Sequence, residues 1–255
     1  MLKIQTFGNK THITDLLIVH GLFGSGRNWR AIARNISSDR QVHVVDMRNH
    51  GESFWNADNS YESMAEDLKK IITSLKSSVD VLGHSMGGKA SMVLAINNPD
   101  LVNRLLIVDI APTKYQHDQS INISIMKNLP IDDLSRRSDA DLILKKTLPD
   151  DALRAFFLQS LIISPNGNSW QLNLDALDKN MDKIIGFPDV SGQFNGVTFF
   201  LKGELSNYIS DKDLPDINRL FPRNKIITIK NSGHWVHAEA TRDFLISVKK
   251  YLSGS

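Results

Sequence analysis

The stretch VLGHSMGG, residues 81–88, decides how this chain folds. A short apolar run that predicts a buried strand leads into it, and residues 89–96 behind it predict a helix. The pentapeptide GHSMG matches G-x-S-x-G, the tight turn between a strand and a helix that lifts a serine hydroxyl out of a sheet. Gly83 and Gly87 satisfy the steric demand of such a turn, where larger side chains would collide with the strand or the helix. We therefore predict Ser85 as a nucleophile, the alternative being an inert serine in a glycine-bordered turn.

The segments around this turn alternate between strand and helix patterns as far as residue 111. The predicted strands are 2–7, 16–19, 41–47, 79–82 and 105–110, and the predicted helices are 28–35, 60–75 and 89–96. This alternation predicts an α/β fold with a mostly parallel, doubly wound sheet that has its first strand at an edge. Catalytic groups in such sheets lie at the carboxyl ends of strands. Ser85 and the loop that begins at His20-Gly21 both occupy that edge.

The alternation stops in the middle of the chain and later returns. Helical patterns follow one another there, at 118–128, 138–144, 150–162 and 172–184. A strand at 197–203, a helix at 213–221, a strand at 225–229 and a closing helix at 236–252 come after them. We predict a core domain of residues 1–111 and 194–255, with residues 112–193 inserted as a helical cap, or lid, above the catalytic edge.

The composition of the 255 residues is that of an ordinary globular protein, with 41% hydrophobic and 23% charged residues. The formal net charge is +2 and the basic residues are scattered, so no nucleic-acid surface is expected. Cysteine is absent, which excludes disulfides and thiol chemistry. The first residues lack a signal-peptide pattern, and no apolar run approaches the ~20 residues that span a bilayer. We expect a cytoplasmic monomer or small homo-oligomer that needs no cofactor.

A serine hydroxyl is a poor nucleophile at neutral pH and needs a base within hydrogen-bond reach. His234 lies in NSGHW, residues 231–235, directly after the last predicted strand. A serine early in the chain and a histidine late is the order found in α/β-hydrolases. His237 is the rival base. A metal site of His234, His237 and Glu239 matches no familiar ligand spacing and is not predicted.

The third member should be a carboxylate that holds the tautomer of the imidazole and stabilises its charged form. Asp109, at the end of the strand after the serine's helix, is the first candidate. Glu204 and Asp211 follow a later strand and remain alternatives. The position after that strand where many hydrolases place the acid is occupied by Ser206.

The negative oxygen of the reaction intermediate needs two hydrogen-bond donors. The backbone N–H of Met86 is one candidate, because it lies at the positive end of the helix that follows Ser85. The other should come from the glycine-rich loop after His20, with Leu22 as the first choice and Phe23 next. The side chains of Leu22 and Phe23 would also shape a substrate pocket.

Four motifs together resemble the YbfF-type esterases of the α/β-hydrolase superfamily. They are IVHGLFGS at 18–25, DMRNHGES at 46–53, GHSMGGK at 83–89 and VDIAP at 108–112. The resemblance spans almost the whole chain and implies a serine esterase with a four-helix cap. It implies activity on small acyl esters, with acyl-CoA thioesters as a further class, and it implies that the triad acid is Asp109.

The sequence therefore predicts a serine carboxylesterase. Ser85 attacks an ester carbonyl, His234 relays the proton, Asp109 steadies the imidazolium, and the amides of Leu22 and Met86 hold the oxyanion. Two alternatives remain open. One is a ligand-binding or scaffold protein that keeps the hydrolase shape without hydrolysis, and the other is a lyase or acyltransferase on the same triad.

Overall fold

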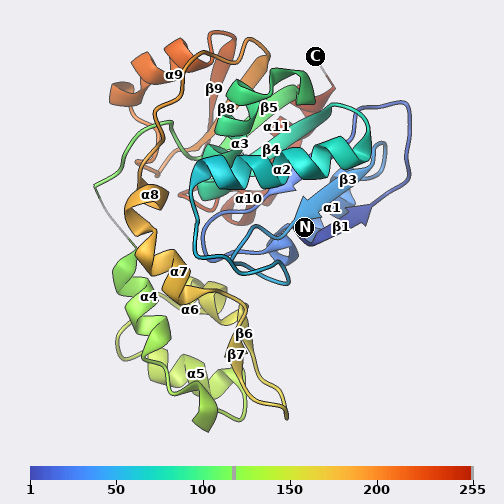
Figure 1. Cartoon of the computed structure of the whole chain (residues 1–255). Coiled ribbons are helices and arrows are strands. Elements are labelled where there is room, and N and C mark those ends of the chain that lie inside the picture. The colour runs from blue at the N-terminus through green and yellow to red at the C-terminus, as the bar shows by residue number, and fades with distance from the viewer. Residues whose placement is uncertain (117–118, 254–255) are drawn as a thin grey trace.

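The structure, a computed structural model, describes residues 1–116 and 119–253. Within them, a seven-stranded sheet has the strand order β1-β3-β2-β4-β5-β8-β9 (Figure 1). Its strands are β1 (Ile4–Phe7), β2 (Leu16–Val19), β3 (Val42–Val45), β4 (Val79–His84), β5 (Val102–Val108), β8 (Val197–Gly203) and β9 (Asn224–Ile229). Edge strand β1 pairs antiparallel with β3, and the other neighbours pair in parallel. The predicted α/β fold with a mostly parallel sheet is confirmed.

Helices cover both faces of this sheet because its inner strands are apolar on both sides. The principal helices are α1 (Arg30–Ile36), α2 (Tyr61–Leu75), α3 (Met86–Asn97), α9 (Leu214–Leu220), α10 (Val236–Glu239) and α11 (Thr241–Leu252). Along β2, Leu17 and Val19 pack in one core with α2 and α3, while Leu16 and Ile18 pack in a second core with α1 and α11. All four side chains are fully buried. The uninterrupted apolar run of β2 is thus explained by burial on both faces.

Residues 112–193, here called the cap segment, contain mainly helices. These are α4 (Ser120–Lys127), α5 (Arg137–Leu144), α6 (Asp151–Leu158), α7 (Leu174–Lys179) and α8 (Met181–Ile185). They lie together at one end of the molecule, away from the large sheet (Figure 1). The helix predicted at 118–128 begins at Asp118, which lies outside the described residues. We propose that this segment acts as a lid on the core.

The helix predicted at 150–162 is wrong in its last residues. α6 ends at Leu158, and β6 (Leu161–Ile162) pairs with β7 (Ser169–Trp170) in a small antiparallel sheet. The connection contains Asn166 and Gly167, and Gly167 has φ of +112°, which glycine adopts without strain. Asn-Gly between two apolar runs is a strong hairpin signal, so the sequence did carry this information.

Two further predicted helices are divided in the structure. The segment 172–184 separates into α7 and α8 at Asn180, whose amide side chain donates to the Ala176 carbonyl and to Ala57. The closing helix 236–252 is interrupted at Ala240, where φ is −129° and ψ is 49°. Short 3-10 helices cover Gly26–Trp29, Pro99–Leu101, Ile131–Asp133 and Asp211–Asp213. Within the described part of the chain, no helix has the length and hydropathy needed to cross a membrane.

Candidate active site

The turn between β4 and α3 holds Ser85 in a strained backbone conformation, with φ of 52° and ψ of −121°. Gly83 and Gly87, on either side of it, lie so close to neighbouring backbone atoms that a side chain would not fit. A Cβ on Gly83 would lie 2.6 Å from the Gly87 carbonyl oxygen, and a Cβ on Gly87 would lie 2.4 Å from the His20 carbonyl oxygen. The predicted steric demand on both glycines is confirmed. The neighbouring strand and helix thus fix the position of the serine hydroxyl.

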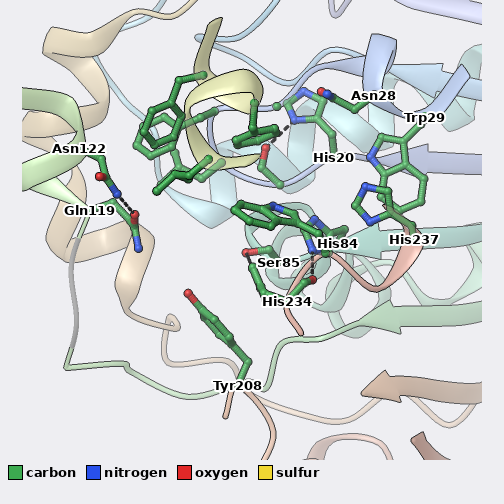
Figure 2. A pocket seen from close by; sticks show the side chains of 18 residues that line it. His20, Asn28, Trp29, His84, Ser85, Gln119, Asn122, Tyr208, His234 and His237 are labelled. Carbon is green, nitrogen blue, oxygen red and sulfur yellow. Dashed lines mark hydrogen bonds between the residues drawn. The ribbon is translucent and has the colours of Figure 1, made fainter. Parts of the chain in front are cut away.

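Three side chains that are distant in the sequence form one hydrogen-bonded chain at the carboxyl edge of the sheet. The Ser85 hydroxyl lies 3.1 Å from Nε2 of His234, and Nδ1 of His234 lies 2.8 Å from Oδ2 of Asp109. Ser85 follows β4, Asp109 follows β5, and His234 lies in the loop after β9. Figure 2 shows Ser85 and His234 together in the pocket. A carboxylate, an imidazole and a hydroxyl in this order can make the hydroxyl nucleophilic.

The carboxylate of Asp109 is fully buried and has a complete set of donors. Its Oδ1 accepts a 2.9 Å bond from the Gly203 amide, and its Oδ2 accepts from the Ser206 hydroxyl as well as from His234. Glu204 is exposed and accepts from the Asn231 amide instead. Asp211 is also exposed, in a short 3-10 helix after the loop.

Two side chains that the sequence did not single out for this purpose hold His234. The ring of Tyr208 stacks on its imidazole, with centroids 3.9 Å apart and 21° between the planes. His84, which directly precedes the serine, donates from Nε2 to the His234 carbonyl oxygen over 3.0 Å. The partner of His84 thus lies in the loop after β9, far from His84 in the sequence. Tyr208 follows no motif, so no sequence signal could have found it.

The amides around Ser85 suit an oxyanion site. Neither Leu22 nor Met86 has a hydrogen-bond partner for its backbone N–H among residues 1–116 and 119–253. The alternative donor, the amide of Phe23, is already used, because it donates to Nε2 of His50 over 3.2 Å. Phe23 as an oxyanion donor is therefore corrected. Its ring lines the pocket, as predicted for its side chain.

Two buried, neutral histidines, His20 and His50, hold the loop that contains Leu22 and Phe23. Burial lowers the pKa of His50 to about 3 and that of His20 to about 4. His50 donates from Nδ1 to the Arg48 carbonyl, which leaves Nε2 free to accept from Phe23. His20 donates to the Gly21 carbonyl and accepts from the Met47 amide in the same way. The segment 46–53 thus braces the loop beside Ser85.

A cavity of about 320 Å³ opens over Ser85 and reaches the cap segment (Figure 2). Its walls are largely aromatic and aliphatic, with Phe23, Leu153, Phe156, Phe157 and Trp235 among them. Gln119 and Asn122 supply polar groups from the cap side. A mostly apolar cavity with a few polar groups is typical of small-molecule sites.

No metal site is predicted at His234, His237 and Glu239, and their side chains have separate partners in the structure. His237 stacks on Trp29 with centroids 4.1 Å apart, and the Glu239 carboxylate accepts from the amides of Gly233 and Trp235. Within the described residues, no group of three His, Cys, Asp or Glu side chains could hold a metal ion. The contacts of Glu239 thus stabilise the loop that carries His234, and His237 packs beside that loop.

Lys89, one helical turn after Ser85, is buried where the chain enters and leaves the cap segment. Its ammonium donates to the carbonyls of Thr113 at 2.8 Å, Ile185 at 2.9 Å and Gly186 at 2.5 Å. The ammonium also lies 4.6 Å from the centre of the Tyr115 ring. The helical pattern of 89–96 did not predict this role, because the three acceptors come from distant parts of the chain. Lys89 joins both crossings of the cap segment to the nucleophile's helix.

The buried lysine leads to a prediction about stability and pH. Burial lowers the pKa of Lys89 from 10.5 to about 7, so the folded protein binds fewer protons than the unfolded chain between these values. The cost of burying the charge is therefore complete below pH 7 and falls as the pH rises toward 10.5. Relative to Lys89→Met, the free energy of unfolding of the unmodified protein should rise by about 1 kcal/mol per pH unit across this window.

Urea unfolding of both proteins at several pH values between 6 and 10 measures this difference. The titratable neighbours Tyr61 and Tyr115 have pKa values raised by burial, so they stay neutral in the window. Parallel stability curves for the two proteins would contradict the prediction.

Fold and site together define a hydrolase with a serine, a histidine and an aspartate at the carboxyl edge of a parallel sheet. A family model described as alpha/beta hydrolase fold matches residues 15–241. The chain belongs to this family. It is an α/β-hydrolase of the esterase and lipase type, as the predicted resemblance indicated.

Three similar proteins illustrate the relationship. The sn-1-specific diacylglycerol lipase ABHD11 of Mus musculus is 38% identical over 93% of this chain and 80% of its own length. Esterase YbfF of Escherichia coli is 30% identical over 99% of this chain and 98% of its own length. A solved structure of a marine microorganism esterase superposes with a TM-score of 0.92 and 37% identity, over 98% of each chain.

Proposed function

We propose that this protein is a serine carboxylesterase that hydrolyses acyl esters through an acyl-enzyme on Ser85. The observation that carries the proposal is the chain of hydrogen bonds from the Ser85 hydroxyl through His234 to the buried Asp109. The esterases and the lipase among its relatives support the same reaction class. The cavity above Ser85 supplies an apolar site for the ester.

The first half of the reaction makes the acyl-enzyme. His234 Nε2 takes the hydroxyl proton as Ser85 Oγ bonds to the carbonyl carbon, and the negative oxygen is held by the amides of Leu22 and Met86. The tetrahedral intermediate then collapses, the bond to the leaving oxygen breaks, and His234 gives its proton to the departing alcohol. Asp109 stabilises the imidazolium between these two transfers.

The second half returns the enzyme to its starting state. Water gives a proton to Nε2 of His234 and attacks the acyl carbon, which forms a second tetrahedral intermediate. Ser85 leaves as the alkoxide, regains the proton from His234, and the carboxylic acid departs. Tyr208 and His84 keep the imidazole aligned through both halves, because one covers its ring and the other holds its backbone.

A covalent probe tests this proposal. A fluorophosphonate should attach to Ser85 with a stoichiometry near one per chain, because a nucleophilic serine attacks phosphorus as it attacks a carbonyl. Intact mass and peptide mass spectrometry would locate the adduct. Ser91→Ala is a matched control, since Ser91 is a buried serine of the same helix that donates to the Gly87 carbonyl. Labelling that persists in Ser85→Ala would refute Ser85 as the nucleophile, and no labelling of the unmodified protein would favour a ligand-binding function.

A further inference from the structure

Two chambers of unequal size meet at Ser85. The larger is the cavity of about 320 Å³, and the smaller measures about 50 Å³. Leu22, Ser85, Gln119 and Tyr208 line both, so the chambers share a boundary at the nucleophile. An ester bound with its carbonyl carbon at Ser85 Oγ must place its acyl part on one side and its alcohol part on the other.

The position of His234 decides which part lies where. Among the described residues, His234 lines the larger chamber and does not line the smaller one. The same imidazole must protonate the leaving oxygen within hydrogen-bond distance, so the alcohol has to depart on the side of His234. The acyl chain then points away from the imidazole, past Met86 and into the smaller chamber.

The smaller chamber limits the acyl chain to a few carbons. A group the size of a water molecule needs about 10–15 Å³ of such space, so the chamber holds about three to five groups of this size. Its walls include the apolar side chains of Met86, Ile110 and Ile184. An uncharged chain of about two to four carbons fills this space and gains from leaving water.

Fixed polar groups form part of the wall of the smaller chamber. Lys89 Nζ lies within hydrogen-bond distance of three backbone carbonyls, which hold it in the wall. The Tyr61 hydroxyl is likewise tied to the Ile184 carbonyl at 2.6 Å. A longer acyl chain would have to displace these bonds, and the cost of doing so makes the chamber selective.

The larger chamber suits a bulky apolar alcohol. The rings of Phe23 and Phe157 meet edge to face with centroids 5.4 Å apart, and those of Phe156 and Trp235 lie 5.5 Å apart. Such rings offer both faces and edges to an aromatic or branched aliphatic group. Aromatic and aliphatic residues line this chamber from the loops and the cap segment, among them Leu22, Phe23, Leu153, Phe156, Phe157 and Trp235.

We propose that the preferred substrates are esters of short, uncharged acids with bulky apolar alcohols, with the acid in the chamber of Met86, Ile110 and Ile184 and the alcohol in the chamber of His234. This inference rests on the proposed esterase function and adds its substrate class. It assigns Ile184 as a determinant of acyl length and Leu153 as a determinant of alcohol size.

Two ester series test the assignment. One varies the acid from two to twelve carbons on p-nitrophenol, and the other varies the alcohol from ethyl to naphthyl and menthyl on a fixed acetyl group. The unmodified protein should prefer acids of two to four carbons by at least about tenfold in kcat/KM over those of eight or more, a difference of about 1.4 kcal/mol. Naphthyl and menthyl acetates should exceed ethyl acetate by a similar factor.

Paired variants separate the two chambers. Ile184→Ala should move the acyl optimum to longer acids, and Ile184→Phe should confine it to acetate, with the ranking of alcohols unchanged in both. Leu153→Ala and Leu153→Trp should change the ranking of alcohols and leave the acyl optimum in place. Opposite shifts from smaller and larger side chains at one position exclude a general loss of folding as their cause.

The outcomes distinguish this assignment from the proposed reaction. A preference for acids of eight or more carbons, or an acyl optimum that follows Leu153 instead of Ile184, would overturn the chamber assignment while Ser85 still forms an acyl-enzyme detectable by mass spectrometry. The absence of both turnover and fluorophosphonate labelling would overturn the esterase function and the chamber assignment with it.

Discussion

Replacement of Ser85 by alanine should lower kcat/KM for a p-nitrophenyl ester by about 10⁵-fold or more, the order of loss seen when a serine hydrolase loses its nucleophile. The physical reason is that the proposed covalent route needs the Ser85 hydroxyl, which bonds the imidazole nitrogen that would take its proton. Hydrolysis of p-nitrophenyl acetate or butyrate at pH 8, corrected for the uncatalysed rate, gives the value directly.

Substitution of Ser85 by glycine should increase stability although it removes the hydroxyl needed for activity. Ser85 has a positive φ of 52°, a conformation that costs a non-glycine residue of order 1–3 kcal/mol. Ser85→Gly should relieve part of this strain, so the inactive variant should unfold at a higher temperature than Ser85→Ala. A lower melting temperature for Ser85→Gly would show that the turn is not strained as its geometry indicates.

Ser91→Ala provides the matched comparison for this pair. It removes a buried hydroxyl from the same helix, away from the cavity, and should lose stability without an equal loss of turnover. If Ser85→Ala retained kcat/KM within about tenfold of the unmodified protein, a mechanism through this hydroxyl would be untenable.

The local part of this site could be predicted from the sequence because its constraints are local. A strand, a turn with glycine two residues on either side of a serine, and a helix leave little freedom in where Ser85 lies. The positions of His234 and Asp109 follow from topology, since parallel strands bring their carboxyl ends to one edge. Topology alone does not distinguish Asp109 from Glu204 as the acid, because both follow strands that end at that edge.

The parts that were missed depend on contacts between distant segments. Lys89 looked like an ordinary helical lysine, because its three carbonyl acceptors lie in the two crossings of the cap segment. The bond that the Phe23 amide donates to His50 was missed as well, because it requires the packing of two separate loops. Periodicity records which face of an element is apolar, but it does not record which distant backbone group a buried polar side chain will meet.

Replacement of Asp109 by asparagine should lower kcat by about 10⁴-fold, because a neutral amide does not stabilise the charged imidazole of His234 as the carboxylate does, and its NH2 group can donate to Nδ1 and so favour the wrong tautomer. The KM should change little, since Asp109 is buried behind the imidazole and does not line the cavity. Steady-state kinetics with a short p-nitrophenyl ester separate the two parameters. A loss of less than about tenfold would mean that another group performs this task.

The Ser206 side chain makes a sharper test of the same role possible. Its hydroxyl bonds the Asp109 oxygen that also accepts from His234, so a carboxylate at 206 would begin within reach of Nδ1. In the double variant Asp109→Ser with Ser206→Asp, the carboxylate and the hydroxyl exchange positions. The Gly203 amide and the His234 imidazole that surround them are unchanged. This variant should recover about tenfold or more of the kcat lost by Asp109→Ser, equal to about 1.4 kcal/mol of transition-state stabilisation.

Ser206→Asp in the background of Asp109 supplies the control for this exchange. Two carboxylates would then share one buried site, which raises the pKa of one of them and destabilises the fold, so this variant should lose stability instead of gaining activity. Recovery in the exchanged protein alone would show that the reaction needs one carboxylate against Nδ1 and is indifferent to the strand that carries it. If the variant is folded and still binds the fluorophosphonate but does not recover kcat, the backbone position of Asp109, with φ of 50°, is itself required to orient the carboxylate.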